Sequence, residues 1–266
     1  MPEPIDNTAP HSSGSAVATA DAAAPVQRRS RRTARTDWRL GSRTVQSWRE
    51  GLLAIALLSL GGGILAGTAA LTAGASPLIA TLLIWLGMLV PIAVGFARSR
   101  PVGLLRFRAI DLLWGFGLGV VLRVVQGWAA GAEGAPVPFP TLVTVDGALA
   151  DGWWFGDVLA PVVIAPLVET SLFSGVILVA LYTVLRRPLG AFTAGLAATL
   201  ASTSLFVFAH LAVGAGAVAD IVAMAALGLV CALLVIFTGR IWGAVLVHAV
   251  FNGAGVTLAL VGTVFG

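Results

Sequence analysis

Lysine is absent from this 266-residue sequence, cysteine occurs once, and only 11% of the residues are charged. The single cysteine, Cys231, has no partner in the chain, which excludes a disulfide framework, and its apolar surroundings predict a buried side chain. The sequence also lacks a glycine-rich phosphate-binding loop and the H-E-x-x-H motif of zinc peptidases. No long internal repeat is visible, which argues against a transporter built from two related halves.

Hydrophobic residues make up 58% of the sequence. The apolar runs reach the roughly 20 residues that an α-helix needs to cross a bilayer. We therefore predict an all-α, polytopic membrane protein with about seven transmembrane helices. The expected spans are approximately residues 51–73, 77–97, 109–130, 157–185, 189–211, 217–238 and 241–264.

The N-terminal segment has a different composition, rich in Ala, Ser, Thr and Pro and then in Arg. Such a segment cannot bury enough apolar surface to offset its ordering entropy, so residues 1–40 are predicted to be a disordered tail and residues 41–266 the transmembrane domain. Eight of the 16 basic residues, all arginines, lie between Arg28 and Arg49, beside the first span. A juxtamembrane cluster of this kind favours anionic lipid, and not nucleic acid, as the partner.

Arginine placement also predicts the orientation. Fifteen of the 16 arginines lie in the tail or in loops on the same side, whereas the opposite loops carry Glu133, Asp146 and Asp151 and no arginine. The positive-inside rule then places the N-terminus in the cytoplasm and the C-terminus outside. The remaining arginine, Arg123, lies within a span.

Several local patterns concern helix ends and packing. Proline, glycine and tryptophan concentrate between about residues 131 and 156, which predicts an irregular loop on the outer surface. Asp111 and Asp157 each begin an expected span, where a carboxylate suits the helix N-terminus, so we assign them a capping role. The pairs Gly63–Gly67 and Gly115–Gly119 have the small-x-x-x-small spacing that allows close helix packing within the chain.

Four spans carry an ionisable residue deep inside an apolar run: Glu169, His210, His248 and Arg123. Ionisable groups are costly in hydrocarbon, so they usually face a protein interior or a wet cavity and indicate a functional site. Arg123 could extend toward the outer interface or pair with Glu169, and the sequence does not choose between these.

The helical period gives each of the other three groups a partner on its own face. Asn252 follows His248 by four residues, Phe206 precedes His210 by four, and Phe173 follows Glu169 by four. With a water held between Glu169 and His210, the glutamate could act as a general base. Asn252 and His248 are suitable donors for a developing oxyanion.

Three motifs occur in separate spans in the order E-x-x-x-x-x-G after A-P-L-V, F-x-x-x-H and H-x-x-x-N. This order resembles the CPBP intramembrane proteases, the CAAX protease and bacteriocin-processing family, over about residues 157–256. The first motif of that family is E-E-x-x-x-R. Here Glu169 matches the first glutamate, while Thr170 and Ser174 stand at the positions of the second glutamate and the arginine.

The resemblance implies an intramembrane endopeptidase that hydrolyses a peptide bond of a membrane-associated peptide or protein. It assigns Glu169 as the catalytic base, His210 as the residue that orients the water, and His248 with Asn252 as the oxyanion donors. Metal dependence stays open, because zinc or another divalent metal could bind two histidines and a glutamate, while a glutamate-base mechanism needs none. A non-catalytic relative with an immunity or scaffolding role and a proton-coupled transporter are the alternatives.

The depths of the two histidines raise a geometric problem. At ~1.5 Å per helical residue, His210 lies ~34 Å along its span from Arg187, whereas His248 lies only ~12 Å from Arg240 on the same side. Straight, level helices would separate the two histidines. Their convergence requires strong tilts, different span ends, or a broken helix near residues 187–195 or 239–243.

Overall fold

The computed structural model describes residues 36–41, 45–132, 139–214 and 216–265 of the chain. Six of its helices are long and apolar enough to cross a membrane. They are α2 (Glu50–Thr72), α3 (Pro77–Arg98), α4 (Ile110–Ala132), a continuous helical segment Trp154–Ala212, α7 (Val218–Thr238) and α8 (Trp242–Phe265). The predicted all-α polytopic membrane fold is confirmed.

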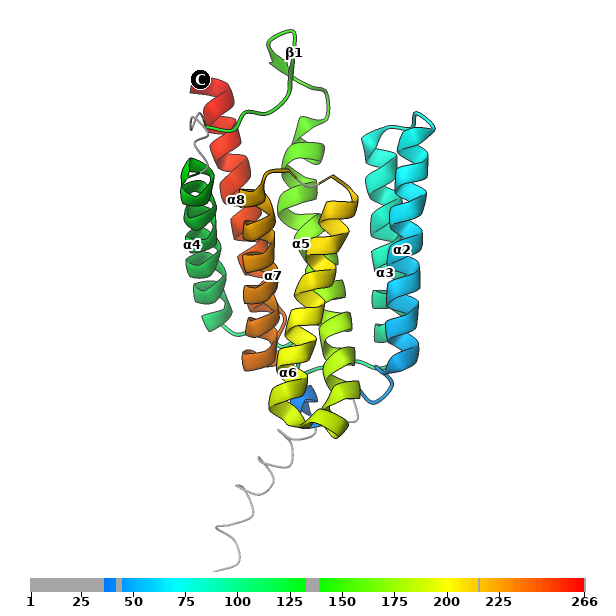
Figure 1. Cartoon of the computed structure of the whole chain (residues 1–266). Coiled ribbons are helices and arrows are strands. Elements are labelled where there is room, and N and C mark those ends of the chain that lie inside the picture. The colour runs from blue at the N-terminus through cyan, green and yellow to red at the C-terminus, as the bar shows by residue number, and fades with distance from the viewer. Residues whose placement is uncertain (1–35, 42–44, 133–138, 215, 266) are drawn as a thin grey trace, which may run out of the picture.

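The segment Trp154–Ala212 accounts for two membrane passages. It consists of the π-helix η3 (Trp154–Ile164), α5 (Ala165–Thr170), the π-helix η4 (Ser171–Ile177) and α6 (Leu178–Ala212). Gly190 interrupts α6 with φ 76° and ψ 170°, a backbone conformation that glycine adopts without steric cost. The chain reverses direction there (Figure 1), so it passes seven times along the bundle.

The glycine pairs predicted to allow close packing do so within the chain. A Cβ atom on Gly63 of α2 would lie 3.1 Å from the Cα atom of Gly87 on α3. On the other side of the molecule, a Cβ atom on Gly119 of α4 would lie 2.7 Å from Cβ of Val250 on α8. The predicted intramolecular role of these glycines is therefore confirmed.

The loop that follows α4 contains a short hairpin, where the sequence predicted irregular structure. Strands β1 (Thr144–Val145) and β2 (Ala148–Leu149) pair antiparallel. The turn between them is Asp146–Gly147, with φ values of 52° and 78°. Positive φ at both central residues is the requirement of a type I′ hairpin turn, for which Asp-Gly is a preferred pair.

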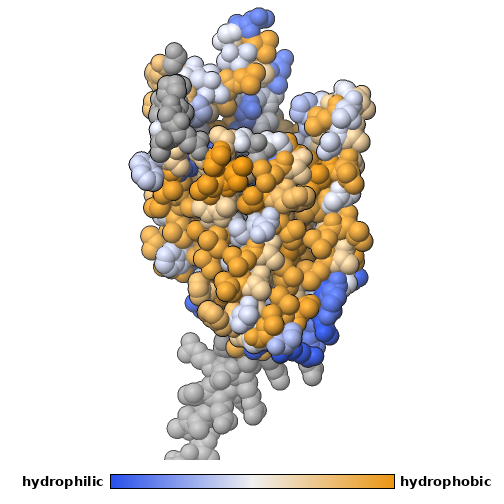
Figure 2. All heavy atoms as spheres, viewed as in Figure 1, coloured by the Kyte–Doolittle hydropathy of each residue, from blue (hydrophilic) through white to orange (hydrophobic). Residues whose placement is uncertain are grey.

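The apolar surface and the charges are segregated along the bundle. Figure 2 shows a broad hydrophobic band across the middle of the visible face, with hydrophilic residues gathered at the two ends. We call one end the arginine-rich end, because the helix ends and loops there carry Arg39, Arg49, Arg98, Arg100, Arg106, Arg108, Arg186, Arg187 and Arg240. The hairpin end lies opposite and includes β1, β2 and the end of α8 (Figure 1).

The final residues of the predicted tail pack onto this helical bundle. Trp38, in the 3₁₀ helix η1 (Trp38–Leu40), is 1% exposed, and its indole N–H donates to the carbonyl of Gly239 over 3.1 Å. Its ring meets Tyr182 edge to face at 5.3 Å. The rest of the predicted tail, residues 1–35, lies outside the described residues.

This packing resolves the depth problem. Through Trp38, Gly239 lies near the level of Tyr182, which precedes the Gly190 reversal by about 12 Å of helix. His248 lies about 14 Å beyond Gly239, hence about 26 Å from the reversal, and His210 lies about 30 Å from it. The two histidines are level because the α7–α8 turn is recessed from the arginine-rich end and η1 lies beneath it (Figure 1).

We expect Trp38→Phe to lower the free energy of unfolding by about 1 kcal/mol, because it leaves the buried Gly239 carbonyl without its donor while keeping an aromatic ring. The change is measured by thermal unfolding of the purified protein, monitored by the circular dichroism of its helical backbone and not by tryptophan fluorescence. Removing residues 1–35 is the matched comparison and should leave the unfolding temperature unchanged, since Trp38 is retained. Equal losses in the two variants would contradict the role assigned to Trp38.

Asp111 has a second role besides capping. Its Oδ2 accepts the backbone N–H of Arg108 over 2.8 Å at the start of α4, and its Oδ1 pairs with a guanidinium nitrogen of Arg240 over 2.6 Å. Asp111 is 0% exposed and Arg240 9%. This buried ion pair joins the first turn of α4 to the α7–α8 turn. Asp157 lies in the first turn of η3, which begins at Trp154, so its predicted place at a helix N-terminus is confirmed.

Candidate functional site

Three of the four predicted site residues come together between α5, α6 and α8. Oε2 of Glu169 lies 3.6 Å from Nε2 of His210 and 3.8 Å from Nε2 of His248. Both distances exceed a direct hydrogen bond and are in the range where a bridging water is to be considered. The carboxylate therefore lies between two imidazoles that belong to different helices.

Each imidazole is oriented by its other ring nitrogen. Nδ1 of His210 lies 2.9 Å from the carbonyl of Phe206, one turn earlier on α6. Since a carbonyl only accepts, this nitrogen is the protonated one, and Nε2 is left as an acceptor in the neutral ring. Nδ1 of His248 lies 3.2 Å from Oγ1 of Thr170, the neighbour of Glu169. Thr170 stands at the position of the family's second glutamate, and here it offers His248 a hydroxyl in place of a carboxylate.

Aromatic rings cover the imidazoles, as the i,i+4 spacing predicted. The ring of Phe206 lies 4.4 Å from that of His210 and 5.8 Å from that of His248, measured between centroids. Phe173 meets Phe206 edge to face at 5.4 Å. Phe206 thus packs against both imidazoles, and Phe173 packs against it from η4.

A small cavity adjoins the carboxylate on the His248 side. Its volume is about 10 Å³, the lower limit for a cavity that holds one water molecule. Polar side chains on its wall include Glu169, Thr170, Ser174, Ser202 and His248. Such a wall can hydrogen-bond a water beside Glu169, which an apolar cavity of that size could not.

An apolar groove reaches the same carboxylate from the other side. It has a volume of about 340 Å³ and runs between the α2–α3 pair and α6, with Glu169 and His210 in its wall. The other lining residues are mostly apolar and are Ile64, Leu71, Pro77, Ala80, Thr81, Ile84, Trp85, Met88, Ala209 and Val213. The side chain of His210 is 28% exposed, against 5% for that of His248, so the His210 side of the site is the accessible one.

Asn252, the fourth predicted residue, has a backbone partner. It lies one turn beyond His248 on α8, and its side-chain Nδ2 donates to the carbonyl of Pro161 over 2.7 Å. At the end of η3 the N–H of Ala165 donates to the carbonyl of Ala160, five residues earlier. By the same spacing the carbonyl of Pro161 would accept from residue 166, but that residue is a proline and has no N–H. Asn252 supplies the missing donor. Its amide nitrogen has a second hydrogen that this bond does not use.

Arg123 does not pair with Glu169, one of the two alternatives that the sequence left open. Its guanidinium donates to Oε1 of Gln126 over 2.7 Å and lies 5.5 Å from the ring centroid of Phe251. Gln126 in turn donates to Asp220 over 2.8 Å. Arg123 therefore belongs to a polar network between α4 and α7 and cannot replace the arginine that the family has at position 174.

Metal binding was left open by the sequence. Within the part of the chain that the structure describes, no group of three or more His, Cys, Asp or Glu side chains is arranged to hold a metal ion. Cys231 is buried and its thiol donates to the carbonyl of Ala244 over 3.4 Å, as expected for a packed, unreactive side chain.

The fold and the comparisons together define the class of the protein. Residues 151–254 match the family model of type II CAAX prenyl endopeptidase Rce1-like proteins. The chain is thus a multi-pass membrane protein whose residues 151–254 are similar to a family of intramembrane proteases. More particularly, this region matches the Rce1-like members of the CAAX protease family, which confirms the resemblance that its motifs indicated. No curated protein and no solved structure matches the chain significantly.

Proposed function

We propose that the protein is an endopeptidase that hydrolyses a peptide bond of a membrane-associated peptide or protein at Glu169. The observation that carries this proposal is the position of the Glu169 carboxylate between the Nε2 atoms of His210 and His248, 3.6 and 3.8 Å away. A substrate segment would reach it along the apolar groove between the α2–α3 pair and α6.

The two imidazoles can serve opposite functions in this reaction. Nε2 of His210 is an acceptor, so it can hold one hydrogen of the attacking water while Glu169 takes the other as general base. If the Thr170 hydroxyl donates to Nδ1 of His248, then Nε2 of His248 is a donor. His248 and the second amide hydrogen of Asn252 would then bind the oxyanion that forms on the substrate carbonyl.

The reaction balances without a further reactant. The water oxygen bonds to the carbonyl carbon as Glu169 removes its proton, and the carbonyl electron pair moves onto oxygen. When the carbon–oxygen double bond re-forms, the carbon–nitrogen bond breaks and the amine takes the proton from Glu169. The products are a carboxylic acid and an amine.

The test is cleavage of a library of membrane-associated reporter peptides by the purified full-length protein in liposomes, with products identified by mass spectrometry. A parallel reaction with a chelator tests for metal dependence. Cleavage by the natural chain supports the proposal. Peptide binding without cleavage would contradict it and indicate a non-catalytic relative, and proton flux without cleavage would indicate a transporter.

Thr170 provides a graded test of the tautomer assignment. Thr170→Val keeps the shape but removes the hydroxyl partner of His248, a hydrogen bond worth about 1 kcal/mol, so kcat should fall about five- to tenfold with little change in KM. Thr170→Ser keeps the hydroxyl and should retain most of the activity. If both variants lose the same activity, the loss comes from altered packing and not from the missing hydroxyl.

We also propose that the arginine-rich end faces the cytoplasm, because the positive-inside rule outweighs other orientation signals near short loops. The last helix, α8, runs from this end to the hairpin end (Figure 1). A reporter fused after Gly266 should therefore be labelled from outside the cell, whereas a reporter at the N-terminus should be protected. Cytoplasmic labelling of the C-terminal reporter would overturn the orientation.

A further inference from the structure

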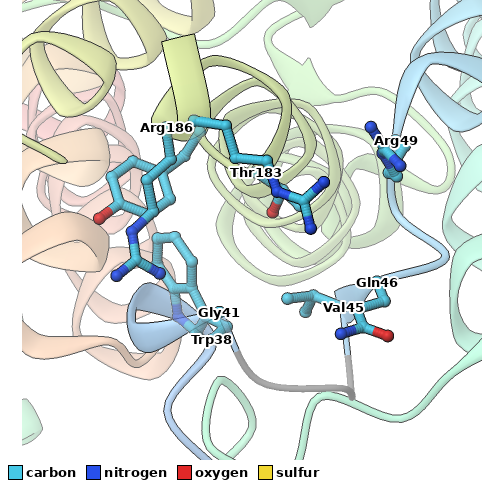
Figure 3. Close-up of a pocket in the computed structure, with 9 residues that line it drawn as sticks. Trp38, Gly41, Val45, Gln46, Arg49, Thr183 and Arg186 are labelled. Carbon is cyan, nitrogen blue, oxygen red and sulfur yellow. The ribbon is translucent and has the colours of Figure 1, made fainter. Parts of the chain in front are cut away.

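A second pocket lies at the arginine-rich end, apart from the Glu169 site. It has a volume of about 510 Å³ and is bounded by η1, the residues just before α2 and the first arm of α6. Figure 3 shows Arg49 and Arg186 on opposite sides of this pocket, with Trp38 and Val45 below them. Its lining also includes Gly41, Gln46, Tyr182, Thr183 and Arg187.

The charge on the lining is almost entirely positive. Arg49 contacts Glu50 over 3.4 Å, an exposed pair that screens it weakly. Arg186 and Arg187 have no ion pair or hydrogen bond to any side chain among the residues whose structure is described. Two guanidinium groups of the pocket therefore keep their hydrogen-bonding capacity for a ligand.

A second carboxylate close to the pocket, that of Asp37, pairs with an arginine outside the lining. Asp37 lies 2.7 Å from the guanidinium of Arg39. Burial by itself raises the pKa of Asp37, but the hydrogen bonds from Arg39 and the charges of Arg39 and Arg186 lower it below its usual value. Asp37 is thus already engaged by Arg39, and Arg186 acts on it only through its charge, without an ion pair.

We propose that this pocket binds the phosphate of an anionic phospholipid in the leaflet at the arginine-rich end. Guanidinium groups present paired N–H donors that match phosphate oxygens, and the pocket has the size of a small-ligand site. The apolar side chains next to it in sequence, Leu40 and Leu189, are 56% and 45% exposed and are available to the glycerol and acyl chains. A free phosphate would use the arginines but not these side chains.

The experiment uses the full-length protein in uncharged detergent, where no charged bilayer surface contributes. Binding of dioleoyl phosphatidylglycerol is measured by native mass spectrometry and by thermal stabilisation, with dioleoyl phosphatidylcholine and inorganic phosphate as parallel ligands. We expect phosphatidylglycerol to bind tightest and inorganic phosphate to give no comparable stabilisation. Equal stabilisation by inorganic phosphate would overturn the lipid assignment in favour of a free anion.

Variants then locate the site. Arg186→Gln with Arg187→Gln should weaken phosphatidylglycerol binding at least tenfold, because about two direct charge contacts are lost. Arg98→Gln with Arg100→Gln removes the same charge from the same end outside the pocket and should change binding less than threefold. Equal losses in both pairs would show general surface attraction and overturn the proposal. If the first pair misfolds, exposed Arg187 alone, as Arg187→Gln, should still give about a threefold loss, and no loss there would also overturn it.

Discussion

Glu169→Gln should lower the rate of peptide cleavage by about 10²- to 10⁴-fold, the range that loss of a general base produces. The substitution keeps the size of the side chain and its place between His210 and His248, so binding in the apolar groove should survive. The effect is therefore expected in kcat and not in KM. Single-turnover cleavage of the best reporter peptide measures it directly.

Glu50→Gln is the matched control for this experiment. Glu50 is the first residue of α2 and its side chain is 65% exposed, far from the site. The same loss of charge there should leave the rate within twofold. A Glu169→Gln variant that keeps more than a tenth of the natural rate would show that another group removes the proton, and the proposed mechanism would fail.

Asp111→Ala should destabilise the protein by about 3–5 kcal/mol, the cost of leaving a buried charge without its partner. Arg240 in the α7–α8 turn, which is 9% exposed in the natural protein, would lose its 2.6 Å contact with Asp111. The start of α4 would also lose the acceptor for the Arg108 N–H. Chemical denaturation of the purified protein gives the change in free energy.

Two comparisons test whether the destabilisation comes from the unpaired buried charge of Arg240. Replacing both partners, as Asp111→Leu with Arg240→Met, should restore much of the stability, because no unpaired charge remains. Glu50→Ala breaks the exposed pair with Arg49 and should cost less than about 1 kcal/mol. A similarly small effect of Asp111→Ala would contradict the importance of the buried pair.

Much of this architecture could be predicted from the sequence because long apolar runs leave few alternatives to helices in a membrane. The approach of Glu169 to His210 and His248 followed from the cost of isolated ionisable groups in hydrocarbon. The pairing of Asp111 with Arg240 did not, since both are charges near span ends and 129 residues separate them. In the sequence, each looks like an ordinary charged residue at the membrane–water interface.

The positions of Trp38 and Asn252 depend on tertiary contacts that cannot be inferred from the composition of the surrounding sequence. Trp38 lies within an arginine- and serine-rich segment, yet it is buried because the recess under Gly239 accepts its ring. Asn252 was expected beside the reacting atoms, but its bond to Pro161 follows from the π-helical geometry of η3 and the missing N–H of Pro166. A π-helix changes which backbone groups lack partners, and side-chain periodicity does not reveal it.

The recessed α7–α8 turn also affects how the protein fits a bilayer. Because this turn lies about 12 Å farther from the Gly190 reversal than a level bundle would place it, no flat hydrocarbon slab of about 30 Å matches every helix at once. Either the bilayer thins beside α4, α7 and α8, or the molecule tilts, and each adjustment has a modest energetic cost. A change in membrane thickness therefore bears on the displacement of the α7–α8 turn, which is the displacement that brings His248 level with His210.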